Sequence, residues 1–326
     1  DKVFNDYDRF SLLLMKNGGV NLSDYAKTTK VLNNAFLKEL HRMFMGLMKF
    51  KEHNVIHHDL KAQNIVYNKE KERCNFIDFG LMCNKKTRMN ESKDNRNGMT
   101  PHHWSFPLEL NFLNRSSFDR KLKSQTPYQI DNYVNNVIND IEKNKYKTPL
   151  GEALGYLLSS VHSVKLSGAS VRDILEGYRE MCYQTSENRK EMDYETFLEK
   201  SLDTVDSYGL GISIMKVLKL IISGRSESTS KEQELGELAF QMYHPSLLKR
   251  IRIEEATSLY EKFLEKYVLE KDEHFVDHKI VKKAKISKKV DKVLDKITLK
   301  DVKMNKKQLD QVSLEPVKDC IKGKEY

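Results

Sequence analysis

Four polar residues have the types and the spacing to act together on a phosphate group. Asp59, Lys61 and Asn64 stand in the string HHDLKAQN at 57–64, and Asp78 follows nineteen residues after Asp59, in the string DFG at 78–80. A loop with this spacing can turn a carboxylate, an ammonium and an amide toward one phosphate. The oxygens of Asn64 and Asp78 are hard donors of the kind that Mg²⁺ prefers. The ammonium of Lys61 offsets phosphate charge.

Three nearby histidines suggest a rival interpretation. His53, His57 and His58 have a spacing that could hold a metal ion. The more ordinary interpretation makes His57 a packed scaffold residue. Each polar group singled out above also occurs by chance in polar loops, whereas the full set in this order rarely does.

A short hairpin is expected to position the two aspartates. Residues 65–67 and 75–77 look like two short, largely apolar strands joined by the charged turn 68–73. Such a hairpin would return Asp78 to the cleft that contains Asp59.

Helices should supply the rest of the support. Upstream, apolar residues recur at three- and four-residue steps over 33–52, which predicts a helix with one buried face formed by Phe36, Leu40, Met43, Leu47 and Phe50. The apolar run 10–15 before it reads as a buried strand that ends in a tight bend at 17–19. Downstream, helices are predicted over 201–222, 232–243 and 253–267. Residues 150–164 also look helical.

The two strings resemble the catalytic loop and the magnesium-binding loop of eukaryotic-type protein kinases, whose first motif is usually His-Arg-Asp-Leu-Lys-x-x-Asn. The resemblance implies that Asp59 orients the attacking hydroxyl and that Lys61 steadies the γ-phosphate of ATP. It implies that Asn64 and Asp78 hold Mg²⁺, and that Gly80 permits the backbone geometry after Asp78. Lys61 follows the pattern of the serine/threonine class.

Three later features resemble protein kinases rather than small-molecule kinases. Pro107-Leu108-Glu109 stands where the family has Ala-Pro-Glu. The string DSYGLG at 206–211 resembles the Asp-x-Trp-x-x-Gly opening of a long central helix, with Tyr208 replacing Trp. Arg250 resembles the arginine that pairs with the glutamate of Ala-Pro-Glu, and Arg252 is the rival partner. We therefore expect a buried pair between Glu109 and Arg250.

The nucleotide site should begin at the hinge. Leu14, Met15, Lys16 and Asn17, followed by two glycines, resemble the strand and linker whose backbone binds adenine. By the same resemblance, Val66 would lie under the adenine ring and Ile77 just before the magnesium loop.

The sequence departs from the family at three places. The chain shows no Gly-rich loop, strand lysine or helix glutamate ahead of Phe10, so we expect them before Asp1 in a longer protein, the alternative being a degenerate kinase. His58 replaces an arginine that often pairs with a phosphorylated loop, which argues against activation of that kind; Thr87, Ser92 and Thr100 are the candidate sites. Glu109 and Asp206 lie 97 positions apart, which implies an insertion of roughly 80 residues.

The predicted fold is α+β and protein-kinase-like: a mainly helical C-lobe, a small β-hairpin at the cleft, and most of the β-rich N-lobe missing. We expect the end of the N-lobe and the hinge at 1–20, the C-lobe with both loops at 21–109, an atypical insertion at 110–200, the remaining C-lobe at 201–270 and a basic tail at 271–326.

Composition narrows the classes of protein to which the chain can belong. The 326 residues are 39% hydrophobic, enough to bury a core, and no run of about 18 apolar residues predicts a membrane span. The four scattered cysteines indicate neither a zinc knuckle nor a disulfide framework, which favours a reducing, cytoplasmic compartment. The net charge of +9 is concentrated in the tail. There an amphipathic helix over 280–299 would recruit an anionic partner or surface, and no clear nucleic-acid motif is present.

The function expected from the resemblance is an ATP- and Mg²⁺-dependent protein serine/threonine kinase acting on protein substrates. The alternative is a pseudokinase or scaffold that binds partners through the insertion and the tail. The long insertion and lysine-rich composition resemble kinases of large DNA viruses. For a viral protein, association with virions is the alternative location.

Overall fold

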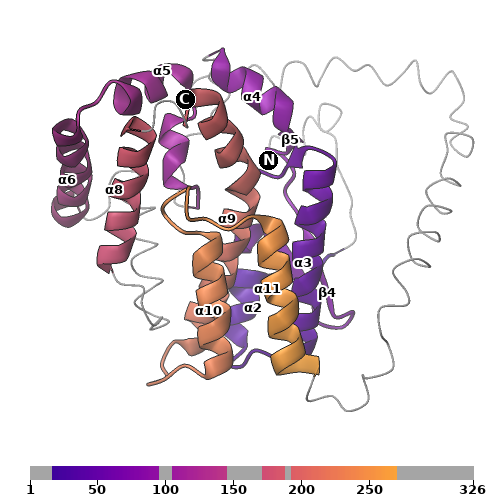
Figure 1. The fold of residues 1–326 in the computed structure, drawn as a ribbon. Helices are drawn as coiled ribbons and strands as arrows, with labels where there is room; N and C mark the ends of the chain where they lie inside the picture. The colour runs from indigo at the N-terminus through magenta and orange to yellow at the C-terminus, as the bar shows by residue number, and fades with distance from the viewer. Residues whose placement is uncertain (1–16, 95–104, 145–170, 188–191, 270–326) are drawn as a thin grey trace, which may run out of the picture. The chain divides into compact units, whose positions relative to one another are not determined.

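The computed structural model describes residues 17–94, 105–144, 171–187 and 192–269 (Figure 1). These residues all fall in one compact unit that ends at Lys271. Several expectations lie outside the described residues: the strand at 10–15, the hinge residues Leu14, Met15 and Lys16, Thr100, and the helices at 150–164 and 280–299.

Two small antiparallel sheets accompany the helices. The first has the order β1-β3-β4, formed by β1 (Val20–Asn21), β3 (Ile65–Asn68) and β4 (Arg73–Phe76). Strands β3 and β4 pair from Ile65 with Phe76 to Asn68 with Arg73, which confirms the expected hairpin. Ile77 falls just beyond β4. The second sheet pairs β2 (Val55–Ile56) with β5 (Cys83–Asn84).

Helix α3 (Asn34–Glu52) confirms the predicted amphipathic helix. The side chain of Asn33 accepts a hydrogen bond from the Phe36 backbone N–H at 2.6 Å and so caps the first turn. The predicted face is buried apart from Phe50, which is half-buried. Helix α3 packs against α11 (Ile253–Leu264), where Tyr260 stacks on Phe44 at 4.4 Å between ring centroids.

Helix α9 (Tyr194–Ile222) is the central element of the described unit (Figure 1). It contacts α2 (Leu22–Thr28) and α10 (Ser230–Met242), and its residues are buried on all sides over most of its length. The helix begins before the predicted start at Ser201, because Asp193 caps it by accepting from the Thr196 backbone N–H at 2.8 Å.

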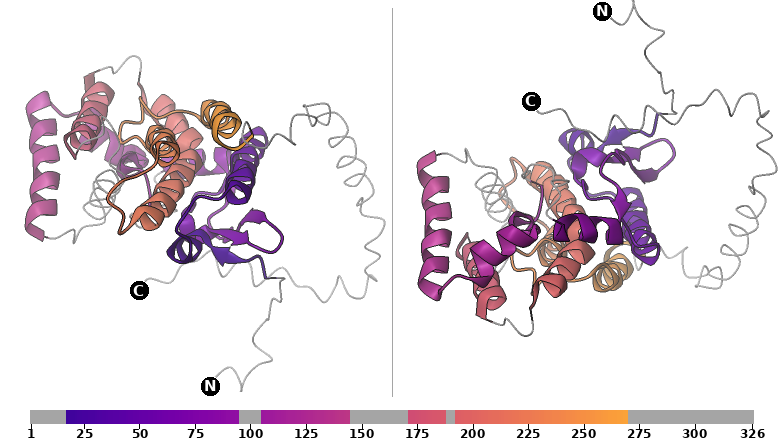
Figure 2. Two further views of the ribbon diagram at one scale, coloured as in Figure 1. Left: turned by 90° about the horizontal axis from the view of Figure 1, so that it is seen from below. Right: turned by 90° about the horizontal axis from the view of Figure 1, so that it is seen from above.

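The region of the expected insertion contains further helices. These are the 3₁₀ turn η3 (Leu108–Phe112), α5 (Arg115–Phe118), the π-helical turn η4 (Asp119–Lys123), α6 (Pro127–Asn144) and α8 (Val171–Glu187). Helices α6 and α8 pack together on the far side of α9 from the β3–β4 hairpin (Figure 2). Gly177 of α8 lies against Pro245 and His244, so the helical pair abuts the loop that ends at Arg250. The expected limits of the insertion stay a prediction.

The fold is α+β as expected, mostly helical with few strands. Among the described helices, none is long and apolar enough to cross a membrane.

Candidate active site

The 57–64 loop brings two of the predicted site residues, Lys61 and Asn64, into contact with a third, Asp59. Lys61 Nζ donates to both oxygens of Asp59, at 2.9 and 2.8 Å. The amide nitrogen of Asn64 donates to Asp59 Oδ2 at 3.0 Å and to the Asp59 backbone carbonyl at 2.8 Å. Asn64 can reach back to Asp59 because a 3₁₀ turn, η2 (Ala62–Asn64), closes the loop just before β3. The sequence spacing therefore places the three groups together, as predicted.

Asp78 is brought beside this cluster through the backbone. The Ile77 backbone N–H donates to the Asn64 carbonyl at 3.0 Å, so the end of the hairpin is tied to the end of the 57–64 loop. His57 Nε2 lies 3.0 Å from the Ile77 carbonyl and donates to it in the tautomer protonated at Nε2. The fully buried His57 ring packs between Phe76 and Phe79, which confirms it as a scaffold residue.

The backbone at Asp78 differs from the expectation. Asp78 has φ +62°, in the left-handed region that aspartate tolerates better than most residues. Gly80 does not have a positive φ, and a Cβ added there would meet only an ordinary contact, 3.5 Å from Asp78 Oδ1. The expectation that Gly80 provides the special geometry was therefore wrong, because Asp78 itself makes the turn.

Asp206 holds the start of the 57–64 loop in place through two hydrogen bonds to its backbone. Its Oδ2 accepts from the His57 backbone N–H at 2.7 Å and its Oδ1 from the His58 backbone N–H at 2.9 Å. Burial raises the pKa of Asp206, and these two donors counteract that rise. Close approach of the loop to α9 also requires Gly209, because a Cβ there would overlap the Leu60 carbonyl oxygen.

The position of Asp206 in its helix corrects the prediction. Asp206 was expected to open the long central helix, but it lies in the middle of α9, which begins at Tyr194. Sequence reasoning missed its role as a backbone anchor. The available signal was a single carboxylate inside the mostly apolar run 205–222.

His58 occupies the position of the arginine found in the family motif. Its backbone is left-handed at φ +67°, and its buried ring stacks on Phe106 at 5.6 Å. Burial, with a smaller contribution from the Arg88 guanidinium, lowers the pKa of His58 to about 4. The side chain is neutral at pH 7, so it provides no positive charge for a phosphorylated residue.

Glu109 and Arg250 form the expected pair. The guanidinium nitrogens Nη1 and Nη2 of Arg250 lie 2.5 and 3.0 Å from the two Glu109 oxygens, and neither side chain is exposed. Arg250 also donates to Thr204 Oγ1 at 3.1 Å and lies over the Tyr208 ring at 4.8 Å. Arg252, the rival partner, is an exposed residue at the N-cap of α11.

The nucleotide side of the site is described only in part. The Asn17 side chain accepts from the Gly19 backbone N–H at 2.9 Å. Gly19 has φ +113° and packs on the Tyr67 carbonyl, which brings the linker against β3. A Cβ added to Gly18 would lie 3.0 Å from Val66, so Val66 borders this linker. Ile77 is 37% exposed.

The candidate phosphorylation sites differ in accessibility. Thr87 is exposed on α4 (Lys85–Lys93), whereas Ser92 of the same helix is 1% exposed. Ser92 is therefore inaccessible to a kinase in this conformation.

The donor set at the site fits Mg²⁺. Because Asp59 accepts from the Asn64 amide nitrogen, the amide oxygen of Asn64 faces away from that carboxylate. Together with the exposed Asp78 carboxylate, it offers the hard oxygen ligands that magnesium prefers. Within the described ranges, no group of three or more His, Cys, Asp or Glu side chains could hold a metal ion.

Comparison with known proteins identifies one family. Residues 11–121 match the model for protein tyrosine and serine/threonine kinase. This stretch includes the 57–64 loop, Asp78 and Glu109, and it ends within η4. No curated protein matches the chain.

Proposed function

Residues 11–121 of this chain belong to the eukaryotic-type protein kinase superfamily, and on that premise we propose that the protein is a serine/threonine kinase. It would transfer the γ-phosphate of ATP to hydroxyl groups of protein substrates.

The observation that carries this proposal is the contact of Asp59 with both Lys61 and Asn64. Phosphoryl transfer requires an acceptor that orients the attacking hydroxyl and a positive charge beside the transferred group. Asp59 is suited to the first role and Lys61 to the second. Lys61 is also the feature that favours the serine/threonine class over the tyrosine class.

Magnesium and ATP would complete the site. Mg²⁺, held by Asn64 and Asp78, would neutralise charge on the phosphates. Val66, Ile77 and Asn17 would contact the adenine, together with Leu14, Met15 and Lys16. The support from the described residues is that the Asn17–Gly19 linker packs on β3 at Val66 and that the Ile77 N–H donates to the Asn64 carbonyl.

The substrate would dock beside the segment that ends at Glu109. The buried ion pair with Arg250 holds that end rigidly, because two parallel hydrogen bonds fix the carboxylate. A rigid segment beside Asp59 is what presentation of a protein hydroxyl requires.

The test is transfer of labelled phosphate to peptides whose only hydroxyl residue is Ser, Thr or Tyr, with the full-length protein. We expect Ser and Thr peptides to be labelled, and Asp59→Asn to reduce the rate by ~10²–10⁴. The control is Asp131→Asn, which removes a partly exposed carboxylate on α6. Labelling of Tyr peptides alone would refute the assignment to the serine/threonine class. Absence of transfer by the parent protein would favour the pseudokinase alternative.

A further inference from the structure

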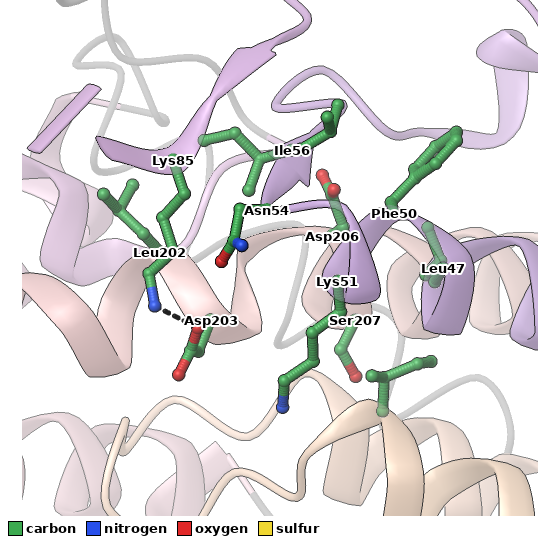
Figure 3. Close-up of a pocket in the computed structure, with 12 residues that line it drawn as sticks. Leu47, Phe50, Lys51, Asn54, Ile56, Lys85, Leu202, Asp203, Asp206 and Ser207 are labelled. Carbon is green, nitrogen blue, oxygen red and sulfur yellow. Dashed lines mark hydrogen bonds and ion pairs between the residues drawn. The ribbon is translucent and has the colours of Figure 1, made fainter. Parts of the chain in front are cut away.

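A pocket of about 210 Å³ is lined by Asp206 and by residues 54–56, which directly precede the loop that Asp206 anchors (Figure 3). It is enclosed by the ends of α3 and α11, strand β2, the first residue of α4 and the middle of α9. Six of the twelve residues that line it are apolar: Leu47, Phe50, Val55, Ile56, Leu202 and Ile253. The pocket can therefore hold a ligand that has both an apolar and a polar part.

The acidic residues of the wall are already paired. Asp203 accepts from Lys85 Nζ at 2.5 Å, and both side chains are mostly buried. Asp206 accepts from two backbone N–H groups. Because each carboxylate receives strong donors from the protein, a cationic ligand would gain little here.

Lys51 is the polar residue best placed to recruit a ligand. Figure 3 shows its ammonium apart from the Lys85–Asp203 pair. It contacts Glu254 at 2.5 Å, but the two side chains are 30% and 47% exposed. An exposed pair of this kind contributes little to stability, so a ligand carboxylate can replace Glu254 at small cost.

We propose that this pocket binds a small carboxylic acid with an apolar body. The carboxylate would pair with Lys51 and the body would fill the space among the six apolar side chains. Pockets for drug-sized ligands measure about 300–1,000 Å³, so a volume of about 210 Å³ suits a single ring or a short branched chain.

This site would contact two functional parts of the molecule. Asp206 holds the 57–64 loop, and Lys85 opens α4 in the segment between Asp78 and Glu109. A bound acid therefore touches the supports of both. Binding itself does not depend on the proposed kinase activity, so the two proposals can fail separately.

The test measures binding of sodium benzoate to the 326-residue chain by calorimetry and ligand-observed NMR. We expect a Kd of about 1 mM, in line with so small a ligand. Benzyl alcohol, which has the ring without the charge, and acetate, which has the charge without the ring, should bind at least about tenfold more weakly.

Variants distinguish the pocket from nonspecific binding. Lys51→Met should weaken benzoate binding by about tenfold or more, and Val55→Phe, which fills the pocket, should abolish it. Lys49→Met is the matched control, because Lys49 forms an exposed pair with Glu52 on the same helix but does not line the pocket. Circular dichroism melting checks that each variant is folded.

Three results would overturn the proposal: no benzoate binding by the parent chain, equal weakening by Lys49→Met and Lys51→Met, or unchanged binding by folded Val55→Phe. The comparison of Lys51→Met with Lys49→Met tests the proposal even if Val55→Phe does not fold. Lys51 is a partly exposed residue, so its replacement should leave the protein folded.

Discussion

Arg250 and Glu109 lie 141 positions apart in the sequence and form a two-point ion pair from which solvent is excluded. The pair joins η3 to the loop before α11. The aromatic ring of Tyr208 lies beneath the guanidinium, where the family motif has tryptophan.

Glu109→Ala should destabilise the protein by ~3–5 kcal/mol, because it leaves the Arg250 charge buried without its partner. The measurement is the free energy of unfolding in urea. Glu254→Ala, which removes an exposed pair with Lys51, should change it by less than about 1 kcal/mol. Equal unfolding midpoints for Glu109→Ala and the parent would contradict a stabilising role for the pair.

Asp206→Asn should impair transfer without contacting substrate. An amide cannot accept from both the His57 and the His58 N–H groups as the carboxylate does, so we expect a loss of ~1–3 kcal/mol in stability. Displacement of Asp59 should lower kcat more than it raises KM. Asp203→Asn, three residues earlier on α9, is the control. If both variants keep the parent kcat, Asp206 does not position the loop.

Asn64→Ala and Asp59→Ala should respond differently to magnesium. Asn64→Ala is expected to act through a metal ligand, so raising the Mg²⁺ concentration should restore part of its activity. Asp59→Ala should lose ~10²–10⁴ in rate without such recovery, because the lost group orients the hydroxyl. Steady-state rates across a magnesium titration provide the measurement, and parallel curves for the two variants would refute the division of roles.

Stability should fall in acid partly through His58. Its pKa is about 4 in the folded protein against 6.5 in the unfolded chain, so the unfolded state binds more protons between these values. The contribution of neutral His58 to the free energy of unfolding is complete above pH 6.5, and it declines as the pH falls toward 4. Between pH 8 and pH 5 the expected loss is about 2 kcal/mol.

The variant that tests this is His58→Phe, which keeps a ring on Phe106 and removes the titration. Its unfolding free energy should fall about 2 kcal/mol less than that of the parent between pH 8 and pH 5. His244, whose pKa burial also lowers to about 4, stays in both proteins and contributes equally. Identical pH profiles for parent and variant would show that His58 does not titrate as described.

Sequence patterns predicted the elements whose two faces differ. In α3 the buried residues recur with helical spacing, and in the β3–β4 hairpin two apolar runs flank a charged turn. The start of α9 was missed because that helix is buried all round, so no polar face marks its period. Strands β2 and β5 contain two residues each, too few to show alternation.

The candidate site was predicted unevenly for a similar reason. The spacing of Asp59, Lys61 and Asn64 is local, so one turn of backbone brings them together. The support given by Asp206 joins residues 149 positions apart, and no local pattern encodes such a contact. Glu109 and Arg250 were linked only through a family resemblance.

Four positions of α9 within two turns contact three different segments of the chain: α4, the loop that contains Arg250, and the 57–64 loop. Asp203 contacts α4, Thr204 contacts Arg250, Asp206 contacts the His57 and His58 backbone, and Gly209 admits Leu60. A small axial shift of this helix would move all of these segments at once. Their positions are therefore coupled through α9. Substitutions at Asp203, Thr204 and Asp206 should therefore combine non-additively in double-mutant cycles, even where the altered side chains do not touch each other.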